Sequence, residues 1–342
     1  IKDKGFILRD KKGIAIRMIG AASNITKRKK GEILMIDEKL ILEKIAANAS
    51  LKSILKVIAL AVEKQIHNSI CSILLMDSDK IHLRYGATPN LPKDYCLAID
   101  GMAIGPNAGA CGTAVHKKKP IFISDISKDP LWKNHKEIVL KYGLKACRSM
   151  PIISKKSNIV LGTIAVYYKK SILPKSSELE LLKRVSNHVR IAIEKKKATK
   201  RLIDSESKYR KLFERNLAGT YQTSIDGQIL RTNKTFANIV GYDSSKKLLQ
   251  QNANIFYFFE SDRKAFIKDI NKNKKLINRE IILKHKNGSK VYLLENCYKR
   301  KDNQIGKEII EVVVIDITKR KNIEKSLEKS LSNIKAIKFI RR

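Results

Sequence analysis

The sequence is poor in cysteine, and its few cysteines form no recognisable pattern. Its five cysteines, 71, 96, 111, 147 and 297, are odd in number, widely scattered and without any C-x-x-C pair. Disulfide-stapled domains and structural zinc sites both need paired or closely spaced cysteines. The pattern argues against both, and it is typical of reduced thiols in the cytoplasm, where we expect the protein to act.

Motifs of the common catalytic classes are also absent. The chain contains no G-x-S-x-G elbow, no P-loop and no G-x-G-x-x-G. His188 is followed by Val189 and Arg190, whereas a histidine-kinase phosphoacceptor would be followed by an acid. The longest nearly uncharged apolar run, 159–168, is about half a membrane span. We therefore predict no catalytic residue, no metal site and no membrane segment in this chain; whether the parent protein is an enzyme stays open.

Acidic residues are few relative to basic ones. The sequence has 33 Asp and Glu and 71 Lys and Arg, which gives a net charge of +38. Only 17 of the 71 are Arg, and the excess is spread along the whole chain. Surfaces that read nucleic acid tend to gather Arg on one face. We therefore expect a Lys-biased surface and no specific nucleic-acid partner, with non-specific nucleic-acid binding as a minor alternative.

A short string occurs twice, as Ser-Asn-Ile-Thr-Lys-Arg-Lys at 23–29 and Ile-Asp-Ile-Thr-Lys-Arg-Lys at 315–321. Each copy follows an apolar, β-branched run and precedes a charged, helix-forming stretch. Asp, Asn and Thr suit helix starts, so each string predicts a boundary between a strand and a helix. Equivalent modules would then end near residues 31 and 320. Because the chain begins at Ile1 without Met, we expect a piece of a longer protein whose first module is incomplete.

Residues 37–196 alternate between two kinds of hydrophobic pattern. Apolar spacings of three and four predict an amphipathic helix over 37–66 and another from residue 176. Between them, period-two or continuous apolar runs predict β-strands. These strands are 69–76, 81–85, 120–126, 149–153 and 159–168. The order of helix, antiparallel sheet, glycine-rich middle and helix indicates an α+β domain.

Residues from about 38 to 196 resemble a GAF domain, in particular the bacterial subfamily found beside cyclic-di-GMP enzymes and sensor histidine kinases. The matching segments are 105–114, 124–126 with 129–132, 143–149 and 161–163. The resemblance implies a ligand pocket, with Gly105, Gly109 and Gly112 allowing a loop to wrap it. Its expected residues are Cys111, Asp125, Trp132, Arg148 and Ser149. Alternatively, the glycines only turn the chain and Trp132 only packs; a redox role for Cys111 with Cys147 is a further alternative.

Residues 206–318 resemble a PAS domain over their full length. Asp226-Gly227 and Asn287-Gly288 predict hairpin turns, Asn233 a helix cap, and Gly241 the left-handed residue after that helix. Given this match, residues 5–30 look like the last two strands of a second PAS domain. The resemblance implies an interior pocket formed by Asn233, Phe236, Phe256, Phe259 and Phe266, although such Phe residues can equally be plain core.

Two cofactors known from PAS domains can be tested against the side chains. A flavin adduct needs a reactive Cys on the central helix, but Cys297 falls in a predicted late strand. Haem needs an axial ligand such as His, and the single His of this segment, His285, lies beside an exposed turn. The sequence therefore argues against both and leaves the cofactor unknown.

The segments that join and follow these domains are helical in character. Residues 179–213 can be read as a nearly continuous helix, and a narrow apolar stripe follows Asp316. The stripe consists of Ile323, Leu327, Leu331, Ile334 and Ile337. It predicts a two-stranded coiled coil and hence a homodimer, or alternatively a single helix packed on its own domain.

The predicted fold class is α+β, with two antiparallel-sheet sensor domains joined by long helices. Its parts are a PAS remnant at 1–31, a GAF domain at 32–197, a linker at 198–205, a PAS domain at 206–318 and a signalling helix at 319–342. The predicted function is to bind a small ligand, or to relay a conformational signal, for a downstream cyclic-di-GMP synthase, phosphodiesterase or histidine kinase. The alternative is that the chain belongs to such an enzyme, whose catalytic part lies outside it.

Overall fold

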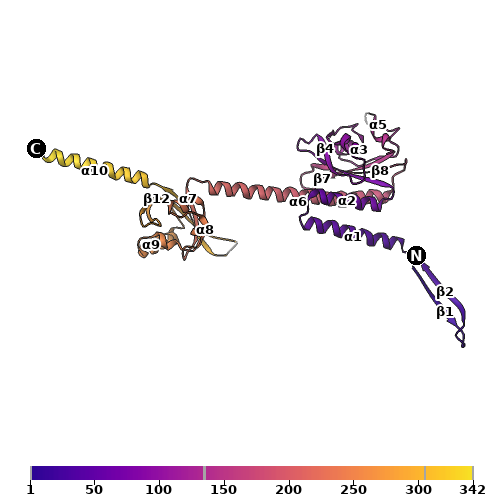
Figure 1. The fold of residues 1–342 in the computed structure, drawn as a ribbon, viewed down its shortest axis with the longest axis horizontal. Coiled ribbons are helices and arrows are strands. Elements are labelled where there is room, and N and C mark those ends of the chain that lie inside the picture. The colour runs from indigo at the N-terminus through magenta and orange to yellow at the C-terminus, as the bar shows by residue number, and fades with distance from the viewer. Residues whose placement is uncertain (1, 134–135, 304–305, 341–342) are drawn as a thin grey trace. The chain divides into compact units, whose positions relative to one another are not determined.

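The computed structural model describes residues 2–133, 136–303 and 306–340 (Figure 1). The chain forms two compact units, residues 1–201 and 202–342. The strands in both units pair antiparallel and the helices pack against them, which confirms the predicted α+β class. None of the helices in the described ranges has the length and apolarity that crossing a lipid bilayer requires.

The first unit begins with a two-stranded hairpin. Strand β1 (Lys2–Arg9) pairs with β2 (Ala15–Ser23), and helix α1 (Thr26–Ala46) follows. Side chains on both faces of the hairpin are exposed, including Phe6 and Met18. An isolated hairpin is marginally stable in water. That it completes a second PAS domain therefore stays a prediction.

The core of the first unit is a six-stranded antiparallel sheet with the order β5-β4-β3-β8-β7-β6. Its strands are β3 (Ser69–Met76), β4 (His82–Ala87), β5 (Met102–Ala103), β6 (Ile121–Ile123), β7 (Ala146–Ile153) and β8 (Val160–Tyr168). Helices α2 (Leu51–Gln65) and α6 (Ser176–Glu214) cover one face, and α1 packs against α2.

The opposite face of this sheet carries shorter elements (Figure 1). They are α3 (Lys93–Ile99), α4 (Gly109–Lys117), the 3-10 turn η1 (Pro130–Trp132) and α5 (Lys136–Lys141). The sheet thus separates two hydrophobic clusters, and successive residues of a strand contribute to opposite ones. On β7, for example, Ala146 and Met150 join the cluster under α2 and α6, whereas Cys147 joins the other.

The second unit is built on a five-stranded antiparallel sheet with the order β10-β9-β13-β12-β11. Its strands are β9 (Gly219–Ser224), β10 (Ile229–Thr232), β11 (Lys275–Lys284), β12 (Lys290–Lys301) and β13 (Glu308–Asp316). Its core is completed by α7 (Lys234–Ile239), α8 (Ser245–Leu248), the 3-10 turn η2 (Ala253–Phe256) and α9 (Glu260–Asn273). Gly241 has φ +84°, which confirms the predicted left-handed residue.

Two long helices carry the chain between and beyond the units. The 39-residue helix α6 runs through the predicted 198–205 linker without a break, as the sequence indicated. Helix α10 (Thr318–Ile340) begins after Asp316, whose carboxylate accepts the Thr318 N–H at 2.8 Å. Ile323, Leu327 and Leu331 are exposed along it. The side chains of Ile334 and Ile337 lie outside the described residues.

Candidate ligand cavity in the first unit

A cavity of about 510 Å³ lies on the sheet face that carries α3, α4 and α5. Its floor is formed by Leu74 of β3 and Tyr167 of β8, and its wall by α3, the segment 101–108, α4, Trp132 and α5. Most of the lining side chains are apolar or aromatic. This volume falls within the usual range of small-molecule sites, about 300–1,000 Å³.

Three buried aromatic side chains line the cavity and carry its polar groups. Tyr95, Trp132 and Tyr167 are each at most 3% exposed. The rings of Tyr95 and Tyr167 meet edge to face, with centroids 6.0 Å apart. The Tyr167 hydroxyl lies 3.6 Å from the Cys111 Sγ and interacts with the Tyr95 hydroxyl, whereas the buried Trp132 Nε1 has no hydrogen-bond partner among the described residues. A buried N–H without a partner, such as that of Trp132, is costly to the folded state.

The backbone of α4 begins in a way that makes room for Trp132. Gly109 has φ +61°, a conformation that residues with a Cβ rarely adopt. A Cβ at this position would lie 3.3 Å from Cη2 of Trp132. Of the three glycines that the sequence singled out around this loop, Gly109 is the one with positive φ. The glycine therefore both turns the chain and lets the indole lie against the start of the helix.

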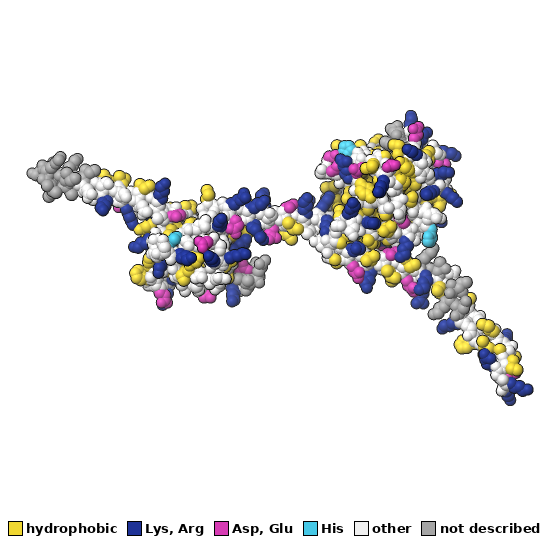
Figure 2. All heavy atoms as spheres, viewed as in Figure 1, with side chains coloured by type: hydrophobic (Ala, Val, Ile, Leu, Met, Phe, Trp, Pro, Cys, Tyr) yellow, Lys and Arg dark blue, Asp and Glu magenta, His cyan; other side chains and the backbone are white. Residues whose placement is uncertain are grey.

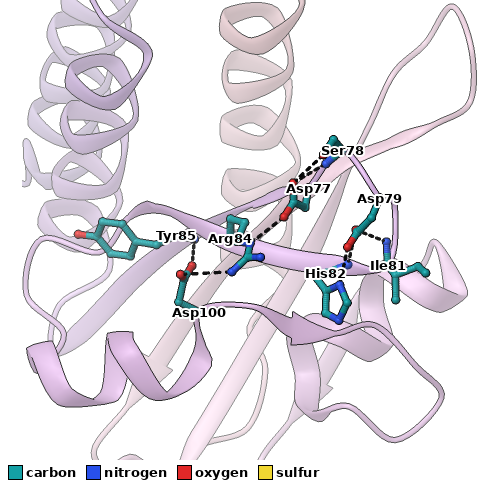
Figure 3. Close-up of polar contacts among 8 residues, drawn as sticks. All are labelled: Asp77, Ser78, Asp79, Ile81, His82, Arg84, Tyr85 and Asp100. Carbon is teal, nitrogen blue, oxygen red and sulfur yellow. Dashed lines mark hydrogen bonds and ion pairs between the residues drawn. The ribbon is translucent and has the colours of Figure 1, made fainter.

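Asp100 is the one charged side chain among the described lining residues. Its Oδ1 accepts the Tyr85 N–H at 2.7 Å, and its Oδ2 lies 3.7 Å from Nη1 of Arg84. Arg84 in turn donates to Asp77 at 2.7 Å (Figure 3). These contacts fasten the loop after α3 to strand β4. They also pair the Asp100 charge with a guanidinium of β4.

Apart from Asp100, the described residues that line the cavity carry no charged side chain. Burial raises the pKa of the Cys111 thiol and of the Tyr95 and Tyr167 hydroxyls, so all three stay protonated near neutral pH. Burial likewise raises the pKa of Cys147. A buried thiol whose pKa is raised is a poor nucleophile, which weighs against the redox alternative for Cys111 and Cys147.

The structure brings together two of the five residues predicted for this pocket. Cys111 and Trp132 line the cavity. Ser149 lies on the same side of the sheet but behind the lining, where its hydroxyl pairs with that of Thr163 at 2.6 Å. Asp125 closes the turn after β6 by accepting the backbone N–H and the hydroxyl of Ser127. Neither Ser149 nor Asp125 is a lining residue.

Arg148 faces away from the cavity. It lies between Cys147 and Ser149 on β7, and because alternate side chains of a strand point to opposite faces, it points toward α6. There it is 2% exposed and pairs with Glu178. The prediction that Arg148 belongs to the pocket is therefore corrected. Its side chain connects the sheet to the helix.

The residues predicted for a pocket in the second unit are mostly structural. Asn233 caps α7: its Oδ1 accepts the Phe236 N–H at 2.9 Å, and its amide donates to two carbonyls. Phe236, Phe256 and Phe266 are buried in one hydrophobic cluster. Phe259, in contrast, is 69% exposed, because it precedes the first turn of α9 and its side chain lies at the surface. Its placement in the pocket is corrected.

A buried polar cluster in the second unit was not expected from the sequence. Glu295 is fully buried on β12, and Nη2 of Arg279 lies 3.3 Å from its Oε2. The Glu295 carboxylate also interacts with the Cys297 thiol and the charge of Arg263, and Arg263 in turn interacts with the Tyr257 hydroxyl. The sequence did contain a signal for it. Glu295 alternates along β12 with Leu293 and Cys297, whose side chains are in the core.

A second hollow of the first unit has a different chemistry. It measures about 550 Å³, and its lining combines apolar side chains such as Leu91 and Leu97 with three exposed lysines, Lys52, Lys56 and Lys93. Solvated lysines of this kind bind anions weakly, because salt screens them. Figure 2 shows Lys and Arg scattered over the visible face of both units and not gathered into one patch. We therefore regard the aromatic cavity as the better candidate site.

Comparisons with known proteins match both halves of the chain. Residues 50–193 match the GAF domain family and residues 218–319 the PAS domain family. The methyl sulfide methyltransferase-associated sensor of Methanosarcina acetivorans is 30% identical over 341 residues, which are 98% of this chain and 34% of that protein. The chain thus spans about a third of that relative.

Two solved structures are similar to single parts of the chain. The GAF domain of a phosphoenolpyruvate-protein phosphotransferase from Coxiella burnetii is 18% identical, with a TM-score of 0.41, covering 50% of this chain and 97% of that one. The PAS domain of an HTR-like protein from Haloarcula marismortui is 20% identical, with a TM-score of 0.30. The match covers 36% of this chain and 99% of that one.

Proposed function

This chain carries a GAF domain and a PAS domain, and from this premise we propose that it is a ligand-controlled relay. The GAF cavity binds a small molecule, and its occupancy changes how helix α6 is held against the sheet. The helices then pass this change toward an output domain. The observation that carries the proposal is the cavity of about 510 Å³ itself, which lies on the sheet and is lined by Tyr167 of β8.

Strands β7 and β8 connect the cavity to α6. On β8, Tyr167 lines the cavity, and its neighbour Tyr168 donates to Glu178 of α6 at 3.0 Å. Further along, the Ser186 hydroxyl of α6 donates to the Pro151 carbonyl of β7 at 3.3 Å. A shift of either strand under a ligand therefore acts directly on bonds to the helix. Because α6 continues to Glu214, a rotation or register shift at its start reaches the PAS domain.

The proposed dimer, and the link to an output domain, rest on helix α10. Ile323, Leu327 and Leu331 recur at spacings of four and are exposed, as a helix face that meets a second copy would be. We propose a homodimer through the terminal helices, with the output domain on the same protein or on a partner. A histidine kinase or a cyclic-di-GMP enzyme is the proposed output class. The free thiols of all five cysteines support a cytoplasmic site of action.

Hydrogen exchange tests the relay. Ala98 is an exposed residue at the cavity, so Ala98→Trp fills the space without disturbing the core. Ala198→Trp, on an exposed position of α6, is the matched control. We expect the filled cavity to change amide exchange in residues 176–194 and in β7, and the control to leave β7 unchanged. Identical exchange in β7 and 176–194 for Ala98→Trp and wild type would contradict a relay through α6.

A further inference from the structure

We infer that the hollow lined by Lys52, Lys56 and Lys93 is a second binding site, which takes a small amphipathic anion with an apolar body and one negatively charged group. The hollow and the aromatic cavity share only Asp100 among their described lining residues. The inference therefore does not depend on the proposed function. It rests on the apolar lining, on how the polar groups of that lining are paired, and on the charge at the rim.

The lining of the hollow suits an apolar body. It comes from the exposed face of α2, from residues 85–89 and from α3, and the volume of about 550 Å³ is typical of small-molecule sites. The Thr88 hydroxyl and the Cys96 thiol lie 2.9 Å apart, and the thiol contacts the Leu91 carbonyl at 3.9 Å. Because these groups are paired with one another, the part of a ligand that contacts them needs no hydrogen-bonding group.

The rim of the hollow is positively charged. Lys52 and Lys56 lie one turn apart on α2, and Lys93 is the first residue of α3. All three are exposed and form no ion pair with a described residue, in contrast to Lys64 farther along α2, which pairs with Asp37 at 3.2 Å. Their charges are therefore available to an anionic group that lies at the rim.

The two parts of such a ligand reinforce each other. Exposed lysines alone hold a small anion weakly, because salt screens their charges. Asp100 is the one acidic residue of the described lining, and Nη1 of Arg84 lies 3.7 Å from its carboxylate and offsets its charge (Figure 3). Burial of an apolar body adds a contribution that salt does not screen. An amphipathic anion uses both contributions, whereas an inorganic anion or an uncharged apolar compound uses only one.

Two probes with the same ring system test the charge requirement. Anilinonaphthalene sulfonate is an amphipathic anion, phenylnaphthylamine is its counterpart without the sulfonate, and the fluorescence of both rises in an apolar site. We expect the anion to bind at least about fivefold more tightly, and this difference to shrink as the salt concentration rises.

Thiol labelling locates the bound probe. Cys96 lines the hollow and is partly exposed, whereas the other four cysteines are buried. Iodoacetamide, which is small and uncharged, should therefore alkylate Cys96 first, as the mass of the labelled peptide shows. With the anionic probe at about ten times its Kd, this alkylation should slow by about tenfold, because only the unbound chain reacts.

Variants of equal charge separate the site from the general charge of the chain. Lys52→Glu combined with Lys56→Glu reverses two rim charges and should weaken binding of the anionic probe by about tenfold. Lys155→Glu combined with Lys156→Glu makes the same change of net charge on an exposed turn outside the hollow, and should leave the binding unchanged.

Leucine variants test the apolar part. Leu97→Ser removes an apolar side chain of the lining and should weaken binding of the anionic probe by about threefold. Leu173→Ser is the matched control, because both leucines are 76% exposed and Leu173 does not line the hollow.

Four results would overturn the inference: no binding of the anionic probe at low salt, equal affinity of the two probes, unchanged alkylation of Cys96, or an equal loss of binding in the two double-lysine variants. Ala98→Trp fills the aromatic cavity and should bind the probe like wild type. Loss of binding in Ala98→Trp would place the anion in the aromatic cavity and would also contradict the second site.

Discussion

Arg148 of strand β7 and Glu178 of helix α6 form an ion pair in the interior of the GAF domain. Tyr168 completes the group, since its hydroxyl accepts from Arg148 at 2.9 Å and donates to Glu178 at 3.0 Å. Arg148 also donates to the Leu173 carbonyl at 2.6 Å. One buried guanidinium thus holds the sheet, the chain before α6 and the first turn of α6 together.

Removing the Arg148 side chain should weaken the attachment of helix α6 to the sheet and leave the cavity intact. Arg148→Ala leaves the buried Glu178 carboxylate with the Tyr168 hydroxyl but without a cation, and breaking a buried ion pair in this way typically costs about 3–5 kcal/mol. The loss is measured by denaturant unfolding followed by Trp132 fluorescence, which reports on this domain. Arg184→Ala is the control, because Arg184 forms a half-exposed pair with Glu38 at 3.8 Å, and exposed pairs contribute about 0–1 kcal/mol. A stable Arg148→Ala chain with weakened ligand binding would return Arg148 to the pocket.

Gly109 should not tolerate a side chain. Gly109→Ala forces a left-handed backbone on a residue with a Cβ, at about 1–2 kcal/mol, and presses the methyl against Trp132. We expect lower stability and a shifted Trp132 emission maximum. Gly105→Ala serves as the control, because its φ is not positive and the nearest atom to an added Cβ is 3.9 Å away. Equal behaviour of the two variants would show that Gly109 does not position the indole.

Glu295 should make the PAS domain sensitive to rising pH. Burial raises the pKa of its carboxyl, and this outweighs the opposite effects of Arg279 and Arg263. An acid with a raised pKa in the folded state contributes most stability below its ordinary pKa and loses it as the pH rises through the raised value. We therefore expect Glu295→Gln to gain protection relative to wild type, in hydrogen exchange of residues 290–301, as the pH increases from about 5 to about 8.

The control for this pH effect is Glu260→Gln, an exposed residue of α9 paired with Lys264 at 2.9 Å. In this variant, amide hydrogen exchange of residues 290–301 should equal that of the wild-type chain at every pH. A constant difference between Glu295→Gln and wild type across the range would mean that the pKa of Glu295 is the same in the folded and unfolded chain.

The exposed stripe on α10 should hold the proposed dimer together. Leu327→Lys places a charge within the stripe and is expected to shift the chain from dimer to monomer in light scattering after size exclusion. Glu328→Lys changes the charge on the neighbouring exposed position and should leave the dimer intact. A monomeric wild-type chain at micromolar concentration would contradict the dimer.

Local chemistry could be predicted from the sequence because its causes are local. Asn233 caps a helix, and Gly241 and Gly288 adopt positive φ, since each depends on a few neighbouring residues. Cys111 and Trp132 were found through a family resemblance that spans the loop around the cavity. Tyr95 was missed because it lies on a short helix without a motif.

The sequence predicts less reliably to which face of a sheet a buried side chain points. Strand β7 is buried on both faces, so its sequence shows no alternation of polar and apolar residues that would say on which face Arg148 lies. The register against β8 decides this, with Arg148 opposite Val166 and Ser149 opposite Ala165. Phe259 was misplaced for a related reason, since the start of α9 determines whether its ring points inward.

The most direct test of the account is native mass spectrometry of the purified chain, with a denatured sample as reference. We expect a small-molecule mass that is lost on denaturation, is absent from Ala98→Trp and persists in Ala198→Trp. A wild-type chain whose mass is the same in the native and the denatured sample would contradict a ligand-binding GAF cavity.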